Sequence, residues 1–111
     1  MKSAGTMTWE FPDGTKRVTK AYAPLNILAH AEIFEITVPQ ACGGQAECGT
    51  CRVRVTSGEV TGMLGDEVEL RADHPRHFED DERLSCRARP RGDVVVRLRG
   101  RAPVDLRDEG T

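Results

Sequence analysis

Residues 42–51 read CGGQAECGTC and place three of the chain's four cysteines within ten positions. The fourth cysteine, Cys86, is separated from Cys51 by 34 residues, so the spacing is C-x5-C-x2-C-x34-C. A disulfide uses cysteines in pairs and would leave one of the three clustered sulfurs over. The pattern therefore predicts a site that joins three neighbouring sulfurs to one distant sulfur.

Three common cysteine sites fit this spacing poorly. A structural zinc site usually takes two close cysteine pairs, and only Cys48 and Cys51 form such a pair. A Rieske centre needs histidines placed near the cysteines, and the three histidines of this chain are not placed that way. A thioredoxin-like Cys-x-x-Cys motif would leave Cys42 and Cys86 without a role.

A two-iron, two-sulfur cluster accounts for all four cysteines. Such a cluster takes four thiolates, with three close together in sequence and one distant. Gly43, Gly44 and Gly49 let the loop turn sharply and bring backbone N–H groups close to sulfur. We therefore predict one 2Fe–2S cluster. Its ligands are expected to be Cys42, Cys48, Cys51 and Cys86.

The segments around the cysteines predict a mixed sheet with one main helix packed across it, an α+β fold. Met7, Trp9 and Phe11 alternate with polar residues, as a strand does, and Asp13-Gly14 is a strong hairpin signal. We expect the last two strands to form a hairpin with one apolar and one basic face, and Ser85 to be a strand residue. The predicted strands are residues 7–11, 15–22, 52–56, 84–89 and 94–99, and the predicted helices are residues 24–34 and 64–72.

The segments CGGQAECGTCRVRV and RLSCR, with this order of elements, resemble 2Fe–2S ferredoxins of the β-grasp (ubiquitin-like) fold. The gap of five residues between Cys42 and Cys48 resembles adrenodoxin-type and related bacterial ferredoxins. The resemblance implies a one-electron carrier between a ferredoxin reductase and an acceptor redox enzyme, such as an oxygenase or a cytochrome P450. It also implies that Cys42 and Cys48 hold the iron nearer the surface, and Cys51 and Cys86 the inner iron.

Charge is segregated along the chain, although the net charge is only −2. Residues 59–82 contain nine acids and two arginines, a net of −7, whereas residues 83–107 contain eight arginines and two acids, a net of +6. One interpretation is that the acidic stretch docks a charged partner, as acids between the third and fourth cysteines do in adrenodoxin-type proteins. The other is a solvated surface with internal salt bridges. The acidic net charge and the 5% aromatic content argue against nucleic acid as a partner.

Length and composition limit the remaining classes of function. The 111 residues predict a single domain, residues 1–111, and no apolar run is long enough to span a membrane. The first residues have no apolar stretch typical of a secretory signal, so we expect a cytoplasmic protein. No G-x-G-x-x-G motif is present, so we expect an electron-transfer protein rather than an enzyme with its own nucleotide site. The alternatives are an iron–sulfur redox sensor and a structural zinc-binding interaction domain.

Overall fold

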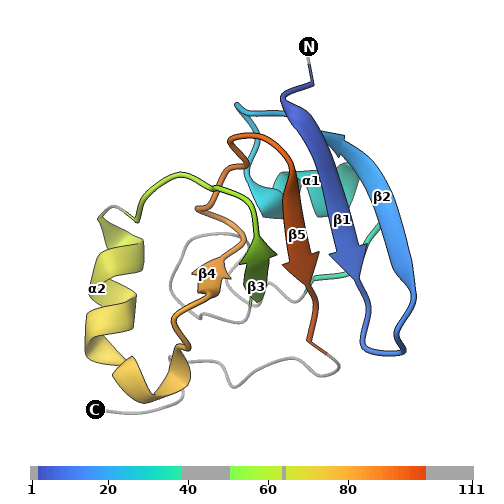
Figure 1. Ribbon diagram of the computed structural model, residues 1–111. Helices are drawn as coiled ribbons and strands as arrows, with labels where there is room; N and C mark the ends of the chain where they lie inside the picture. Colours follow the sequence, from blue (N-terminus) through green and yellow to red (C-terminus); the bar gives the residue numbers. More distant parts are fainter. Residues whose placement is uncertain (1–2, 39–50, 64, 100–111) are drawn as a thin grey trace.

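The computed structural model describes residues 3–38, 51–63 and 65–99, so the predicted ligands Cys42 and Cys48 lie outside the described residues. Five strands form one sheet in the order β2-β1-β5-β3-β4 (Figure 1). β1 and β5 run parallel, and the other neighbouring strands are antiparallel. The elements are β1 (Gly5–Glu10), β2 (Lys16–Ala21), α1 (Ile27–Ile33), β3 (Arg52–Ser57), α2 (Asp66–Asp73), a 3-10 turn η1 (Pro75–His77), β4 (Glu82–Leu84) and β5 (Val94–Arg97).

The predicted architecture is confirmed: a mixed sheet carries one helix, α1, across one face (Figure 1). The predicted hairpin at Asp13-Gly14 is present, and Gly14 adopts φ +90°, which a glycine allows without strain. α2 lies at the other end of the molecule, beyond the β4 edge of the sheet (Figure 1). No helix in the described part of the chain is both long enough and apolar enough to cross a bilayer.

The core lies between α1 and the central strands. Its buried side chains include Met7 and Trp9 from β1, Ile27 from α1, and Val94 and Val96 from β5. The alternation of buried and exposed residues in β1 and β5 is the strand period that the sequence showed. Burial of these aliphatic side chains and of the single tryptophan supplies most of the stability of so small a sheet.

α1 begins three residues later than predicted. The sequence placed Pro24 at the first helical position, but the helix starts at Ile27, and Asn26 caps it by accepting a hydrogen bond from the Ala29 backbone N–H at 2.7 Å. An asparagine side chain satisfies an amide that would otherwise lack a partner at the helix start, and a proline cannot do this. After the helix, Glu35 takes the left-handed conformation, φ +59°, that a glycine often supplies.

The predicted hairpin of residues 84–89 and 94–99 is wrong. β4 is Glu82–Leu84 and pairs with β3, whereas β5 pairs with β3 and with β1. Ser85 and Cys86 therefore follow the strand and lie in a turn, and Pro90 bridges to Val60 instead of closing a hairpin. β3 lies between the two strands: one of its edges pairs with β4 and the other pairs with β5.

Candidate metal centre

Two of the four predicted ligands, Cys51 and Cys86, are brought together although 34 residues separate them. Their Sγ atoms lie 3.4 Å apart, and both residues are almost completely buried. A disulfide would hold the sulfurs about 2.05 Å apart, so these two cysteines are not joined to each other. Two thiolates on one tetrahedral metal, with bonds of about 2.3 Å, would lie roughly 3.8 Å apart. The observed spacing fits two ligands of one metal ion after a small adjustment.

β3 and β4 place these two cysteines side by side. Arg52 pairs with Leu84 in the antiparallel ladder, and the next residues continue the pairing, because the Ser85 N–H donates to the Cys51 carbonyl at 3.2 Å. The chain then turns, with the Arg87 and Ala88 N–H groups both donating to the Leu84 carbonyl at 3.0 Å. The turn points the Cys86 sulfur towards Cys51.

The first turn of α1 fixes the segment that carries Cys86. The Leu28 N–H donates to the Ser85 carbonyl at 2.8 Å, and the Ile27 N–H donates to the Ala88 carbonyl at 2.9 Å. The side-chain amide of Asn26 donates to the carbonyl of Cys86 at 3.0 Å. Amides at a helix start have no partner within the helix, so this turn supplies the acceptors that they need.

The environment favours a thiolate at Cys51. The pKa of Cys51 is lowered from 9.0 to about 6, mainly by the hydrogen bond with the neighbouring Cys86 thiol and to a smaller extent by Ser85, while burial acts in the opposite direction. The thiolate is the form of cysteine that binds metal. A pair of buried cysteines, of which Cys51 has a lowered pKa, is therefore suited to hold iron rather than to serve as inert core residues.

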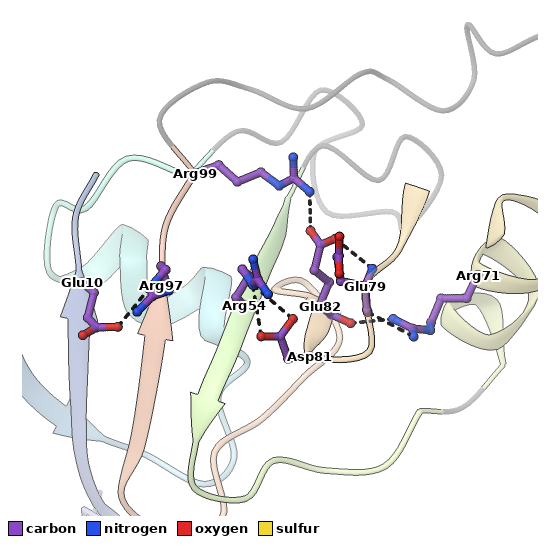
Figure 2. Close-up of polar contacts among 8 residues, drawn as sticks. All are labelled: Glu10, Arg54, Arg71, Glu79, Asp81, Glu82, Arg97 and Arg99. Atoms are coloured by element: carbon purple, nitrogen blue, oxygen red, sulfur yellow. Dashed lines mark hydrogen bonds and ion pairs between the residues drawn. The ribbon is translucent and has the colours of Figure 1, made fainter. Parts of the chain in front are cut away.

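Acids of residues 59–82 form ion pairs with arginines, and Figure 2 shows two of these pairs, Asp81–Arg54 and Glu82–Arg99. Four of the nine acids in residues 59–82 are paired with arginines; the pairs are Asp66–Arg87, Glu67–Arg83, Asp81–Arg54 and Glu82–Arg99. On β5, which was predicted to have a basic face, Arg97 pairs with Glu10 at 3.3 Å. Much of the charge segregation in the sequence is thus neutralised in the fold.

Five acids of this stretch remain exposed and have no ion pair within residues 3–38, 51–63 and 65–99; they are Glu59, Glu69, Asp73, Glu79 and Asp80. Glu69 and Asp73 are one turn apart on α2, so they share a face of that helix. Fewer acids are therefore available to a partner than the sequence indicated, and we call Glu69 and Asp73 the α2 face.

Glu67 ties α2 to the metal centre, although no sequence pattern singles it out. Glu67 is 1% exposed and accepts two hydrogen bonds from the Arg83 guanidinium, at 2.8 and 2.9 Å. It also accepts from the Leu84 N–H at 3.0 Å, two residues before Cys86. The acid-rich sequence of α2 does not indicate that this carboxylate, unlike its neighbours, is buried.

The chain matches a family model described as the 2Fe-2S iron-sulfur cluster binding domain over residues 10–91. Rhodocoxin of Rhodococcus erythropolis is 32% identical over 100 residues, which cover 84% of this chain and 94% of rhodocoxin. A component of the Na(+)-translocating NADH-quinone reductase of Idiomarina loihiensis is 38% identical over 76 residues, 67% of this chain. The match spans only 17% of the length of that component.

A solved structure has the same fold. The crystal structure of a ferredoxin from Rhodopseudomonas palustris HaA2 superposes with a TM-score of 0.71 at 25% sequence identity. The superposition covers 87% of this chain and 98% of that one. The β-grasp arrangement predicted from the sequence is thereby confirmed.

Proposed function

The chain belongs to the family of 2Fe-2S ferredoxins, which are electron carriers with one cluster, and we propose that it takes electrons singly from a ferredoxin reductase and delivers them to an acceptor redox enzyme. An oxygenase or a cytochrome P450 is the class of acceptor that we propose. The observation that supports this role most directly is the pair of buried sulfurs of Cys51 and Cys86, 3.4 Å apart. On this proposal the protein is a carrier and not an enzyme.

We propose that the cluster ligands are Cys42, Cys48, Cys51 and Cys86. The sites of Cys51 and Cys86 fit this role because their sulfurs are close and buried and the pKa of Cys51 is lowered. When bound, a 2Fe–2S cluster supplies reversible one-electron oxidation and reduction. The chain holds the sulfurs in place through β3, β4 and the first turn of α1, and it excludes water from Cys51 and Cys86.

The exposed α2 face supports a refined docking proposal. Glu69 and Asp73 would attract basic side chains of a reductase. Glu67 connects this helix to the strand before Cys86, so a partner on the α2 face would lie against an element anchored to the metal centre.

We also propose that residues 1–111 form a single domain and that the protein is cytoplasmic, where thiols stay reduced.

The decisive experiment is an ultraviolet–visible spectrum of anaerobically purified protein before and after dithionite, with iron and acid-labile sulfide measured on the same sample. We expect a brown protein that bleaches partly, recovers in air, and contains about two iron and two sulfide per chain. Replacing Cys86 by serine should reduce the cluster content, whereas Ser57→Ala, an exposed serine on β3, should not. A colourless wild-type protein that contains zinc would contradict the proposal.

A further inference from the structure

The hydroxyl of Ser85 is the feature of the metal centre that the fold leaves unexplained. Ser85 is completely buried, and its Oγ has no hydrogen-bond partner of ordinary geometry among the residues that the structure describes. A buried hydroxyl without a partner is unfavourable, and native proteins nearly always provide an acceptor for it. We therefore expect the functional protein to provide an acceptor beside the Ser85 hydroxyl.

The main chain of Ser85 gives no reason for a serine at this position. Its N–H donates to the Cys51 carbonyl at 3.2 Å, and its carbonyl accepts from the Leu28 N–H at 2.8 Å. An alanine could make both hydrogen bonds equally well. The hydroxyl thus has to be explained by something that the side chain alone can reach.

The sulfur of Cys51 is the candidate acceptor. The hydrogen bond between the two main chains holds Ser85 opposite Cys51, and the buried Cys51 sulfur lies beside the sulfur of Cys86, the residue that follows Ser85. A thiolate, or a thiolate on a metal, carries more negative charge than a neutral thiol and accepts a hydrogen bond more strongly. The hydroxyl can rotate about its C–O bond to meet this sulfur.

We propose that the Ser85 hydroxyl donates a hydrogen bond to Cys51 Sγ in the cluster-bound protein and thereby raises the reduction potential of the cluster. Reduction adds one electron, and part of the added negative charge falls on the cysteine sulfurs. A donor aimed at one of them stabilises the reduced form more than the oxidised form. Ser85 keeps its proton throughout, so the reaction remains a transfer of one electron. The inference rests on the proposed role of Cys51 as a cluster ligand.

The test is the midpoint potential of the holoprotein, measured by anaerobic redox titration of the visible spectrum. Ser85→Ala should lower the potential, because it removes the donor and keeps the main chain. The matched control Ser57→Ala removes a hydroxyl from the exposed end of β3 and should leave the potential unchanged. A potential in Ser85→Ala equal to or above that of the wild type would overturn the inference.

Resonance Raman spectra give a second measurement that a purely structural role would not change. In the wild type, the iron–cysteine stretching bands should shift between H2O and D2O, and the shift should be smaller in Ser85→Ala. An equal shift in both proteins would overturn the inference. If Ser85→Ala does not retain the cluster, Ser85→Gly removes the hydroxyl without added bulk and takes its place in both measurements. A wild-type protein without a cluster would instead refute the proposed function, so the two failures are distinguishable.

Discussion

The side chain of Asn26 joins the start of α1 to Cys86: its amide nitrogen donates to the Cys86 carbonyl at 3.0 Å, while its Oδ1 accepts from the Ala29 N–H at 2.7 Å. One residue thus caps the helix and holds the turn that carries a proposed ligand. The two hydrogen bonds use opposite ends of the amide, so they can be removed separately.

We expect Asn26→Asp and Asn26→Ala to separate these two roles. Aspartate still caps the helix but cannot donate to the Cys86 carbonyl, whereas alanine loses both hydrogen bonds. Loss of the cap should cost about 1 kcal/mol, so Asn26→Ala should be less stable than Asn26→Asp. Chemical denaturation, followed by the fluorescence of the single, fully buried tryptophan Trp9, measures the free energy of unfolding of both variants. Equal stability of the two variants would contradict the assigned cap.

The ion pair between Glu67 and Arg83 should matter more to stability than the neighbouring pair between Asp66 and Arg87. Glu67 is 1% exposed, and removing one partner of a buried pair leaves an uncompensated charge, at a cost of about 3–5 kcal/mol. The side chain of Asp66 is 47% exposed, and pairs of this kind contribute about 0–1 kcal/mol. Glu67→Gln should therefore shift the denaturation midpoint strongly and Asp66→Asn only slightly. Similar shifts would contradict this ranking.

Gly58 occupies a position that no larger residue fits. Its φ is +87°, and a Cβ built on it would lie 2.0 Å from the carbonyl oxygen of Asp93, in the bend directly before β5. Gly58→Ala should lower the free energy of unfolding by more than about 1 kcal/mol, since the backbone must move. Gly62→Ala is the matched control, because a Cβ there meets nothing within 4 Å. Thermal unfolding of the two variants should differ clearly, and equal melting temperatures would contradict the close approach.

His30 should make the protein sensitive to mild acid. The Tyr22 N–H donates to Nε2 at 2.8 Å, so Nδ1 carries the proton and donates to the Asn26 carbonyl at 2.7 Å. A second proton on Nε2 would face the Tyr22 N–H, and burial lowers the pKa of His30 below 6.5. The unfolded chain therefore takes up a proton before the folded chain does, and the contribution of His30 to stability is complete above pH 6.5 and is lost as the pH falls below it.

Below pH 6.5 the protonation of His30 should lower the free energy of unfolding by up to about 1.4 kcal/mol per pH unit, and above pH 6.5 His30 should contribute no slope. His30→Gln should remove this slope, whereas His74→Gln, in the turn before η1, should retain it. Denaturation midpoints at several pH values provide the measurement. If the free energy of unfolding of His30→Gln still falls with the same slope below pH 6.5, the slope belongs to another group.

Docking through the α2 face predicts a salt-dependent rate of reduction. The double variant Glu69→Gln/Asp73→Asn should slow reduction by a purified ferredoxin reductase severalfold at low ionic strength. The difference in rate between this variant and the wild type should be smaller at high ionic strength, because the Debye length falls from about 10 Å at 0.1 M to about 3 Å at 1 M salt. Glu32→Gln/Glu35→Gln removes the same charge near the end of α1 and should have little effect. Equal rates for the two double variants would contradict docking at this face.

The sequence alone determined the type of fold and the type of site. The alternation in β1 and β5 and the Asp13-Gly14 turn are local patterns, and each predicts its structure within a few residues. The spacing of the cysteines indicates the kind of cofactor. The tertiary structure decided which strands pair, which acids are exposed and what surrounds the sulfurs. β3 lies between β5 and β4, so the predicted hairpin does not form and Ser85 lies in a turn rather than in a strand.

The physical reason is that burial and pairing depend on partners far apart in the chain. Glu67 and Asp66 are neighbours with the same charge, yet only the contact with Arg83, 16 residues away, makes one of them a buried anchor. Ser85 gains its proposed role from Cys51, which the ladder between β3 and β4 brings beside it. Local periodicity cannot encode such contacts, because it records which face a residue occupies and not which residue meets it there.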